Sequence, residues 1–297
     1  MQTEILGPLA AFGSSITWAW ASLGYSKLAK HNSAFAVSFT RSMFGFPMFV
    51  VTTLLVGQIS DFYKVTFSHL GWFALSTFSS YGFADALFLS STRSLGVPGA
   101  LAITSTYPIW TALFGYFFKS ETLVPLQLLG LGITIVGVIT VVLTTPARNE
   151  KTNRKDIATG ICFAMATSIL WAVNGFAIAN GTLGISIPVA NVLRLISGVV
   201  MTPLFAKILL PRAPLTMTKA DVKFGAKYFM VEAFFGSMFF TYGLAHSPLA
   251  IGATLSSLAP VVSVPMAWVL KTEKVTINRT LGILAVVLGL AFLVGGR

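Results

Sequence analysis

Long stretches without a charged side chain are the feature that most constrains this chain. They cover residues 5–26, 42–60, 94–118, 122–147, 157–193, 233–270 and 280–296. A helix that crosses the hydrocarbon core of a bilayer needs about 20 mostly apolar residues. Several stretches are therefore long enough for one span, and two of them for nearly two. The pattern predicts a polytopic membrane protein.

Composition supports a membrane protein and argues against a nucleic-acid partner. Of the 297 residues, 55% are hydrophobic and 10% are charged, whereas a soluble domain carries roughly a quarter charged residues. The net charge of +11 would fit a nucleic-acid-binding protein. However, the Lys and Arg residues lie at the ends of the apolar stretches, where they act as membrane anchors and topology signals. We therefore expect no nucleic acid as a partner.

Enzyme and metal chemistry have no signature in this sequence. The motifs HExxH and GxSxG and the phosphate-binding P-loop do not occur. Cys162 is the single cysteine, and the histidines His31, His69 and His246 are too scattered for a metal site. We expect no enzymatic activity, no metal, no cofactor and no ATP-driven transport by this chain alone.

Ten transmembrane helices are predicted, separated by short connections that often contain Gly, Pro or Asn. One such connection is "GVPG" at 96–99, and the most polar one, 145–156, divides the chain near its midpoint. The predicted helices cover 5–27, 34–57, 70–92, 96–118, 124–144, 157–179, 186–208, 224–245, 249–270 and 278–295.

The chain repeats itself at an offset of about half its length. Residues 7–48 align with 160–201 at an offset of 153 without a gap, and ten of the 42 positions are identical. An offset of 152 aligns the later part. Informative identical pairs are Trp18/Trp171, Arg41/Arg194, Ser105/Ser257, Pro108/Pro260, Glu121/Glu273, Gly130/Gly282 and Gly137/Gly289. Such pairs at a nearly constant offset predict an internal repeat.

Each half then holds five helices, and because five is odd the second half enters the membrane in the opposite sense. We predict an all-α polytopic membrane protein with ten transmembrane helices as two inverted five-helix repeats. The repeats are residues 1–147 and 157–297, joined by a polar linker at 148–156. Many secondary transporters have this architecture, with the solute site near the membrane midplane between the repeats.

The doubled order of motifs resembles a known family. A Trp-Ala pair lies in the first helix of each half, at 18–19 and 171–172, and a proline in each fourth helix is followed thirteen residues later by Glu. This order looks like the drug/metabolite transporter superfamily, EamA type, over essentially the whole chain. The family usually has Gly-Glu-Arg/Lys between helices 4 and 5, whereas this chain has Ser-Glu-Thr at 120–122 and Thr-Glu-Lys at 272–274.

The resemblance implies a solute carrier with a central cavity. In the family this cavity is lined by helices 1, 3, 4, 6, 8 and 9, and helices 2 and 7 are peripheral. Family members move amino acids, other metabolites or amphipathic compounds, often outward, so the family does not fix the substrate.

Positive charge is concentrated on one predicted face of the membrane. The connections after helices 1, 3, 5, 7 and 9 hold fifteen Lys and Arg residues, and the other face holds Lys64, Lys119 and Arg297. The positive-inside rule then places both termini outside the cytoplasm, whereas the resemblance implies both inside. We expect a multi-pass protein of the plasma membrane, the inner membrane of a bacterium, which contacts lipid and functions as a monomer.

Four ionisable residues fall inside predicted spans: Arg41, Asp85, Arg194 and Glu232. A charge in lipid is costly, so such residues face the protein interior or a wet cavity. Arg41 and Asp85 share a depth, which predicts a structural ion pair between helices 2 and 3; alternatively, Asp85 faces the cavity. Arg194 is expected in a structural ion pair as well. Glu232, near the middle of helix 8, either binds solute or a proton, or pairs with Arg194.

Aromatic and small polar residues complete the candidate binding set. Trp18 and Trp171 lie near span centres, where an indole N–H needs a partner, and cavity lining and ordinary packing explain them equally well. The predicted substrate-binding residues are Trp18, Tyr81, Asp85, Ser105, Tyr107, Trp171, Asn174, Glu232 and Ser257.

Two prolines lie about twelve residues into the fourth and ninth helices. Pro108 and Pro260 each remove one backbone hydrogen bond and kink the helix near the midplane. The kinks suit a gating helix beside the solute site, and a static bend for packing is the alternative.

These features favour a secondary carrier of a small organic solute that works by alternating access, driven by a proton or solute gradient. Our first choice is an exporter of amino acids or related metabolites. Efflux of cationic, amphipathic drugs stays open because Glu232, Trp18 and Trp171 would form an acidic aromatic box. A sugar-phosphate or nucleotide-sugar carrier is weaker, because the cavity helices carry almost no Lys or Arg at depth. A membrane enzyme and a non-transporting scaffold are remote alternatives.

Overall fold

A computed structural model describes residues 2–119, 124–143, 154–212, 214–247, 249–269 and 276–295. Within these ranges the ordered elements are all helical, and no strand is present. The prediction of an all-α polytopic fold is confirmed. The polar linker predicted at 148–156 lies mostly outside the described residues, which resume at Arg154.

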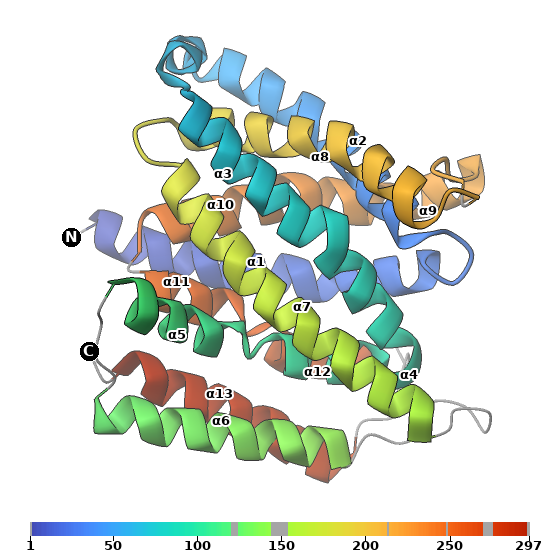
Figure 1. Cartoon of the computed structure of the whole chain (residues 1–297), viewed down its shortest axis with the longest axis vertical. Helices are drawn as coiled ribbons and strands as arrows, with labels where there is room; N and C mark the ends of the chain where they lie inside the picture. Colours follow the sequence, from blue (N-terminus) through green and yellow to red (C-terminus); the bar gives the residue numbers. More distant parts are fainter. Residues whose placement is uncertain are drawn as a thin grey trace.

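In the first half of the chain, the described residues form six α-helices, one 3₁₀ segment (η1) and one π-helical segment (η2), shown from blue to green in Figure 1. Their bounds are α1 Gln2–Leu28, α2 Ala34–Leu55, η1 Ile59–Lys64, α3 Phe67–Thr77, η2 Phe78–Ala84, α4 Asp85–Thr104, α5 Tyr107–Lys119 and α6 Pro125–Leu143.

The second half contains seven α-helices and a second π-helical segment (η3) among the described residues. Their bounds are α7 Arg154–Gly181, α8 Ile187–Leu209, α9 Lys219–Met230, η3 Val231–Gly236, α10 Ser237–Ala245, α11 Leu249–Ser256, α12 Ala259–Val269 and α13 Ile277–Gly295.

These elements follow the predicted order of ten spans, although four spans are interrupted. The third span is α3–η2 with the start of α4, and the eighth is α9–η3–α10. Gly96 has a φ of 70° inside α4, a conformation that glycine adopts without a steric penalty. This residue makes the predicted turn between the third and fourth spans. The fourth span continues into α5, and the ninth is α11 followed by α12.

By length and mean hydropathy alone, four helical stretches in the described ranges are long and apolar enough to cross a membrane. They are Ala34–Leu55, Phe67–Phe114, Arg154–Gly181 and Ile187–Leu209, and two shorter apolar helices cover Leu128–Gly137 and Thr280–Phe292. Large apolar side chains lie exposed on the outside of several helices, among them Leu55, Ile208 and Ile277. Apolar surface of this extent is typical of a membrane interface.

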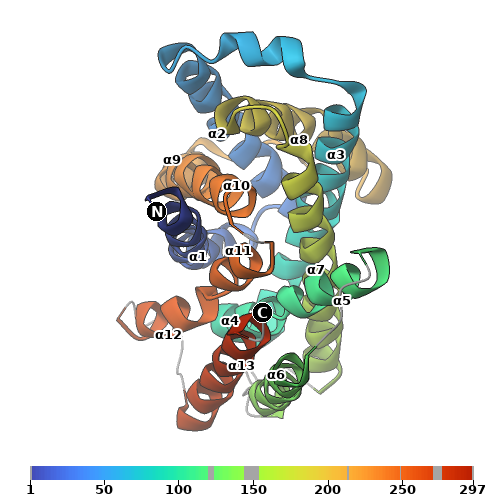
Figure 2. The same cartoon turned by 90° about the vertical axis from the view of Figure 1, so that its left-hand side faces the viewer.

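Helix packing follows the internal repeat. Figure 2, which views the molecule along most helix axes, shows α6 beside α13 and α2 beside α8, and each pair joins equivalent helices of the two halves. The packing of α4 on α7 has its counterpart in the packing of α10 on α1. The two halves therefore complete each other, as expected for inverted repeats.

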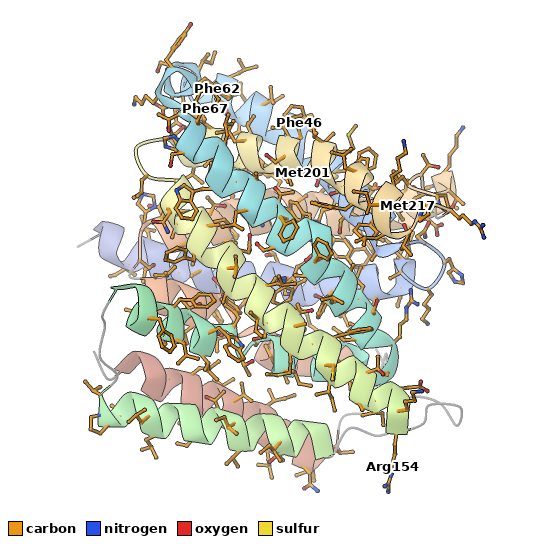
Figure 3. The ribbon with its side chains drawn as sticks, viewed as in Figure 1. Phe46, Phe62, Phe67, Arg154, Met201 and Met217 are labelled. Carbon is orange, nitrogen blue, oxygen red and sulfur yellow. The ribbon has the colours of Figure 1, made fainter. Side chains whose placement is uncertain are left out.

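Connections predicted to share a membrane face meet at the same end of the molecule. Asn32 donates a hydrogen bond to Asp221 (3.2 Å), and Ser33 donates to the carbonyl of Pro214 (3.3 Å). These contacts join the α1–α2 connection to the α8–α9 connection and to the first turn of α9. Arg154 and Met217 lie toward this end in Figure 3, on the right.

The opposite end is fastened by contacts of η1 and the first turn of α3 with the α7–α8 connection. The ring of His69 lies 2.9 Å from the carbonyl oxygen of Leu183, and the backbone N–H of Ser186 donates to Asp61 (3.0 Å). Lys64 pairs with the same carboxylate at 2.7 Å. The bonds from Lys64 and Ser186 hold the pKa of the Asp61 carboxyl below its usual range.

The contact between α6 and α13 depends on glycines. A Cβ on Gly137 would lie 2.6 Å from the backbone nitrogen of Val286, and one on Gly289 would lie 2.5 Å from that of Thr134. Small residues let helix backbones approach closely in membranes. Glycines that the sequence repeat pairs, Gly137 and Gly289, therefore lie at a close helix contact.

Replacing Gly137 by Val should destabilise the protein by about 1–3 kcal/mol, because the new side chain meets backbone rather than a movable side chain. Thermal unfolding in detergent measures the effect. Gly132→Val is the matched control, since a Cβ at Gly132 on the same helix meets no atom within 4 Å. Equal melting temperatures for the two variants would contradict the close contact.

Candidate solute-binding site

A cavity lies between the two repeats and is lined by residues from both. Its empty volume is about 640 Å³, counting space that opens to solvent. The lining residues are Ser14, Thr17, Trp18, Arg41, Ser80, Asp85, Ser105, Tyr107, Trp171, Asn174, Arg194, Glu232, Gly236, Ser237, Phe240, Ser256, Ser257 and Ala259. Eight of the nine residues predicted to bind substrate are therefore brought together here.

Arg41 is the centre of the charged part of the cavity. Its guanidinium lies 2.5 Å from Asp85 of α4, and its Nε lies 3.5 Å from Glu232 of η3. The hydroxyl of Tyr25 donates a hydrogen bond to the same oxygen of Glu232 at 3.2 Å. All three charged residues are buried, so mutual pairing offsets part of their desolvation. The predicted Arg41–Asp85 pair is present, and both residues also line the cavity.

Two expectations about the arginines require correction. Glu232 pairs with Arg41 rather than with Arg194, because Arg41 approaches it from α2. Arg194 was expected in a structural ion pair, but no carboxylate of the described residues lies within ion-pair distance of it. Both arginines line the cavity, so helices 2 and 7, which the resemblance implies to be peripheral, contribute to it.

Tyr81 forms the wall behind the charged residues and is not part of the lining itself. The guanidinium carbon of Arg41 lies 4.1 Å from the centre of its ring, and that of Arg194 lies 5.1 Å away. Such distances permit cation–π attraction. Tyr81 is almost completely buried, and its hydroxyl has no hydrogen-bond partner within the described structure.

The two repeat-related tryptophans touch each other at the cavity wall. The rings of Trp18 and Trp171 meet edge to face with centroids 5.4 Å apart, and Phe88 lies against both. Each tryptophan thus lines the cavity and also packs in the core. The indole N–H of Trp18 is buried and finds no acceptor among the described residues.

The fourth and ninth spans are broken rather than merely kinked. α4 ends at Thr104 and α5 begins at Tyr107, while α11 ends at Ser256 and α12 begins at Ala259. Pro108 and Pro260 are the second residues of the new helices, where a missing N–H costs no helical hydrogen bond. Ser105 and Ser257 lie in the breaks and face the cavity.

Hydrogen bonds fasten the breaks to neighbouring helices. The hydroxyl of Tyr107 donates to the backbone carbonyl of Ala253 in α11 at 2.7 Å, which links the broken spans of the two repeats. Thr106 lies within hydrogen-bond distance of Ser168 on α7. Asn174, also on α7, accepts a hydrogen bond from Ser76 of α3 at 2.7 Å and lines the cavity.

Two π-helical segments occupy equivalent places in the repeats and were not predicted. η2 begins at Phe78 and η3 at Val231, an offset of 153 like that of the sequence repeat. Glu232 lies inside η3, and Asp85 directly follows η2. Single-turn π segments often occur at functional sites. Here they displace the helix register where the buried acids enter the cavity.

Sequence reasoning also missed several small polar lining residues. Ser14 and Thr17 lie on the same helical face as Trp18, and this i, i+3, i+4 spacing was a usable signal. Ser14 donates a hydrogen bond to Ser256 at 3.1 Å, across the repeats. Ser80 and Ser237 had no comparable signal, because the π segments shift their direction.

Asp85→Asn should lower the free energy of unfolding by about 3 kcal/mol, because it leaves the buried Arg41 with only its more distant partner. In the double variant Asp85→Asn/Arg41→Gln, the loss should be smaller than the sum of the single losses. Thermal unfolding in detergent measures both.

The control is Asp61→Asn, which removes the charge that pairs with Lys64, a side chain exposed outside the spans. It should be far milder, because water screens such a pair and the Asn amide oxygen can still accept the hydrogen bond from Ser186. If Asp85→Asn were as mild as this control, the buried cluster would contribute nothing to stability.

Comparison with known proteins agrees with this geometry. A sequence model of the EamA-like transporter family matches residues 5–143 and 158–295. One solved protein crystal structure is similar in fold, with a TM-score of 0.68 at 15% identity over 97% of this chain and 98% of that chain. No curated protein sequence matches the chain. The family match covers most of the chain, and this integral, multi-pass membrane protein belongs to the EamA-like transporter family.

Proposed function

We propose that this protein is a secondary transporter that exports amino acids or related small metabolites by alternating access. The observation that carries the proposal is one cavity to which both repeats contribute polar and charged side chains. A carrier of this type binds its solute between the repeats and exposes it to one side of the membrane at a time.

The broken spans support a moving part beside the cavity. The turns at Ser105 and Ser257 face the cavity, and Tyr107 links the two broken spans through a side-chain hydrogen bond. A hydrogen bond of this kind contributes about 1 kcal/mol, so it can be exchanged during a conformational change. We infer that Pro108 and Pro260 keep these spans discontinuous in both states.

Charge in the cavity favours a zwitterion over the other candidates. Two arginines and two carboxylates give a net charge near zero when all are ionised, which does not suit a phosphate dianion. Arg41 engages both carboxylates and Arg194 adds a second positive charge to the lining, so the cavity offers a purely cationic drug no excess of negative charge. An amino acid carries both charges and matches such a site.

Glu232 is the group that we propose for proton coupling. It lines the cavity. The distance between Glu232 and Arg41 is 3.5 Å, which is longer than the 2.5 Å between Asp85 and Arg41. Protonation of this carboxyl would release it from Arg41 without breaking the closer pair. Exchange of a proton against the ammonium group of a solute would then couple transport to the proton gradient.

We further propose a bacterial inner-membrane protein that functions as a monomer in contact with lipid, with the two repeats at 1–147 and 157–297. The end of the molecule that holds the α1–α2 and α8–α9 connections belongs to the face with fifteen Lys and Arg residues. By the positive-inside rule this face is cytoplasmic.

In proteoliposomes, a proton gradient should drive uptake of at least one member of a panel of labelled amino acids. Glu232→Gln should reduce the gradient-driven rate about tenfold or more while exchange of solute for solute persists, because Gln carries no titratable proton. Asp221→Asn, on the same span but outside the cavity, is the matched control and should behave like the wild type. Equal gradient dependence in the wild type and Glu232→Gln would contradict the coupling role.

Cysteine labelling tests the proposed orientation. In a Cys162→Ser background, Tyr63→Cys should react with a membrane-impermeant maleimide on intact cells, because the positive-inside rule places this end outside. Thr216→Cys at the basic end should react only after the membrane is opened. The reverse pattern would place both termini in the cytoplasm.

A further inference from the structure

Arg194 differs from its repeat counterpart in one respect that matters for binding. It is 5% exposed, lines the cavity and, within the described structure, has no ion pair or hydrogen bond to its guanidinium. The rings of Tyr81 and Phe240 lie nearby, with centroids at 5.1 and 6.0 Å, and Glu232 interacts with Arg194 electrostatically from beyond ion-pair distance. Arg41, at the equivalent position of the first repeat, engages two carboxylates.

A buried cation without a carboxylate in direct contact is expensive to maintain. A charge removed from water without a partner is strongly unfavourable, and aromatic faces offset only part of this cost. A guanidinium cannot lose its proton in a protein, so Arg194 stays charged. A ligand that brings a negative charge to this place would relieve the cost, whereas a cationic ligand would add to it.

Other unpaired polar groups at the cavity point to the same ligand chemistry. The lining residues Trp18 and Ser237 each have a buried polar group, the indole N–H and the hydroxyl, with no partner in the described part of the chain. Each of them can donate a hydrogen bond. The strongest acceptors nearby, the carboxylates of Asp85 and Glu232, are already held by Arg41. The donors of this site therefore lack acceptor oxygens, which a bound ligand would supply.

We propose that Arg194 binds the carboxylate of the transported solute. This inference deepens the proposed function and rests on it. A carboxylate presents two acceptor oxygens in a plane that matches the guanidinium fork. The solute class is small monocarboxylates, with amino acids preferred because the cluster of Arg41, Asp85 and Glu232 carries one net negative charge for an ammonium group.

The first test needs no substitution. Inhibition of labelled amino-acid uptake into proteoliposomes is measured with the same amino acid, with its amide and with its decarboxylated amine. The amino acid should compete about 10- to 100-fold better than either analogue, the difference expected for loss of charge-assisted hydrogen bonds. Equal inhibition by the amide would overturn the proposal.

The second test compares Arg194→Gln and Arg194→Lys with Lys207→Gln, a control that removes an exposed cation from the same helix. Arg194→Gln should weaken amino-acid binding about 10- to 100-fold and abolish the preference over the amide. Arg194→Lys should keep the preference with reduced affinity, because it retains the charge but not the fork. Lys207→Gln should match the wild type.

The preference for the amino acid over its amide distinguishes a loss of binding from a loss of folding in these variants. If Arg194→Gln fails to fold, the preference measured with Arg194→Lys and with the wild-type analogue series decides the matter. A wild type that transports ethanolamine or putrescine but no carboxylate would overturn this inference and leave a transporter in place. A wild type that moves no amino acid, monocarboxylate, amine or sugar would overturn the proposed function as well.

Discussion

The ion pairs of Arg41 are the interaction on which the rest of the cavity depends. Arg41 and Asp85 belong to the first repeat, whereas Glu232 belongs to the second, so one guanidinium connects the halves beside the solute space. A buried charge without a partner is costly. Any conformational change that separates the repeats must therefore exchange these pairs rather than abandon them, and this requirement limits how the cavity can open.

The inverted repeat makes the two halves of the fold similar, whereas the function requires the two halves to differ at the cavity. α6 and α13 keep glycines at equivalent positions and pack closely, which suits a scaffold. In contrast, Arg41 and Arg194 occupy equivalent positions with different surroundings. The position of the first repeat that corresponds to Glu232 is a serine, Ser80. Two identical halves would present the same charge twice. Because the acids are placed unequally, the charge near Arg194 differs from the charge near the Arg41 cluster. This pattern fits a solute whose two ends carry opposite charges.

Local sequence rules predicted most of the fold. Apolar stretches of span length fixed the helices, Gly96 and the prolines marked the breaks, and the offset of 152–153 exposed the repeat. The same rules failed at η2 and η3, because a π turn leaves no recognisable residue pattern. The peripheral place expected for helices 2 and 7 was also wrong, and this expectation came from the family resemblance rather than from the residues.

The sequence alone determined which residues had to leave the lipid, since Arg41, Asp85, Arg194 and Glu232 are too costly to expose to hydrocarbon. Only the tertiary structure decided how they pair. Glu232 and Arg194 are within one half of the chain, yet Arg41 from the other half takes the carboxylate because α2 packs beside η3. Partner choice depends on distances of a few ångströms between helices far apart in sequence, and these distances arise only when both repeats are packed together.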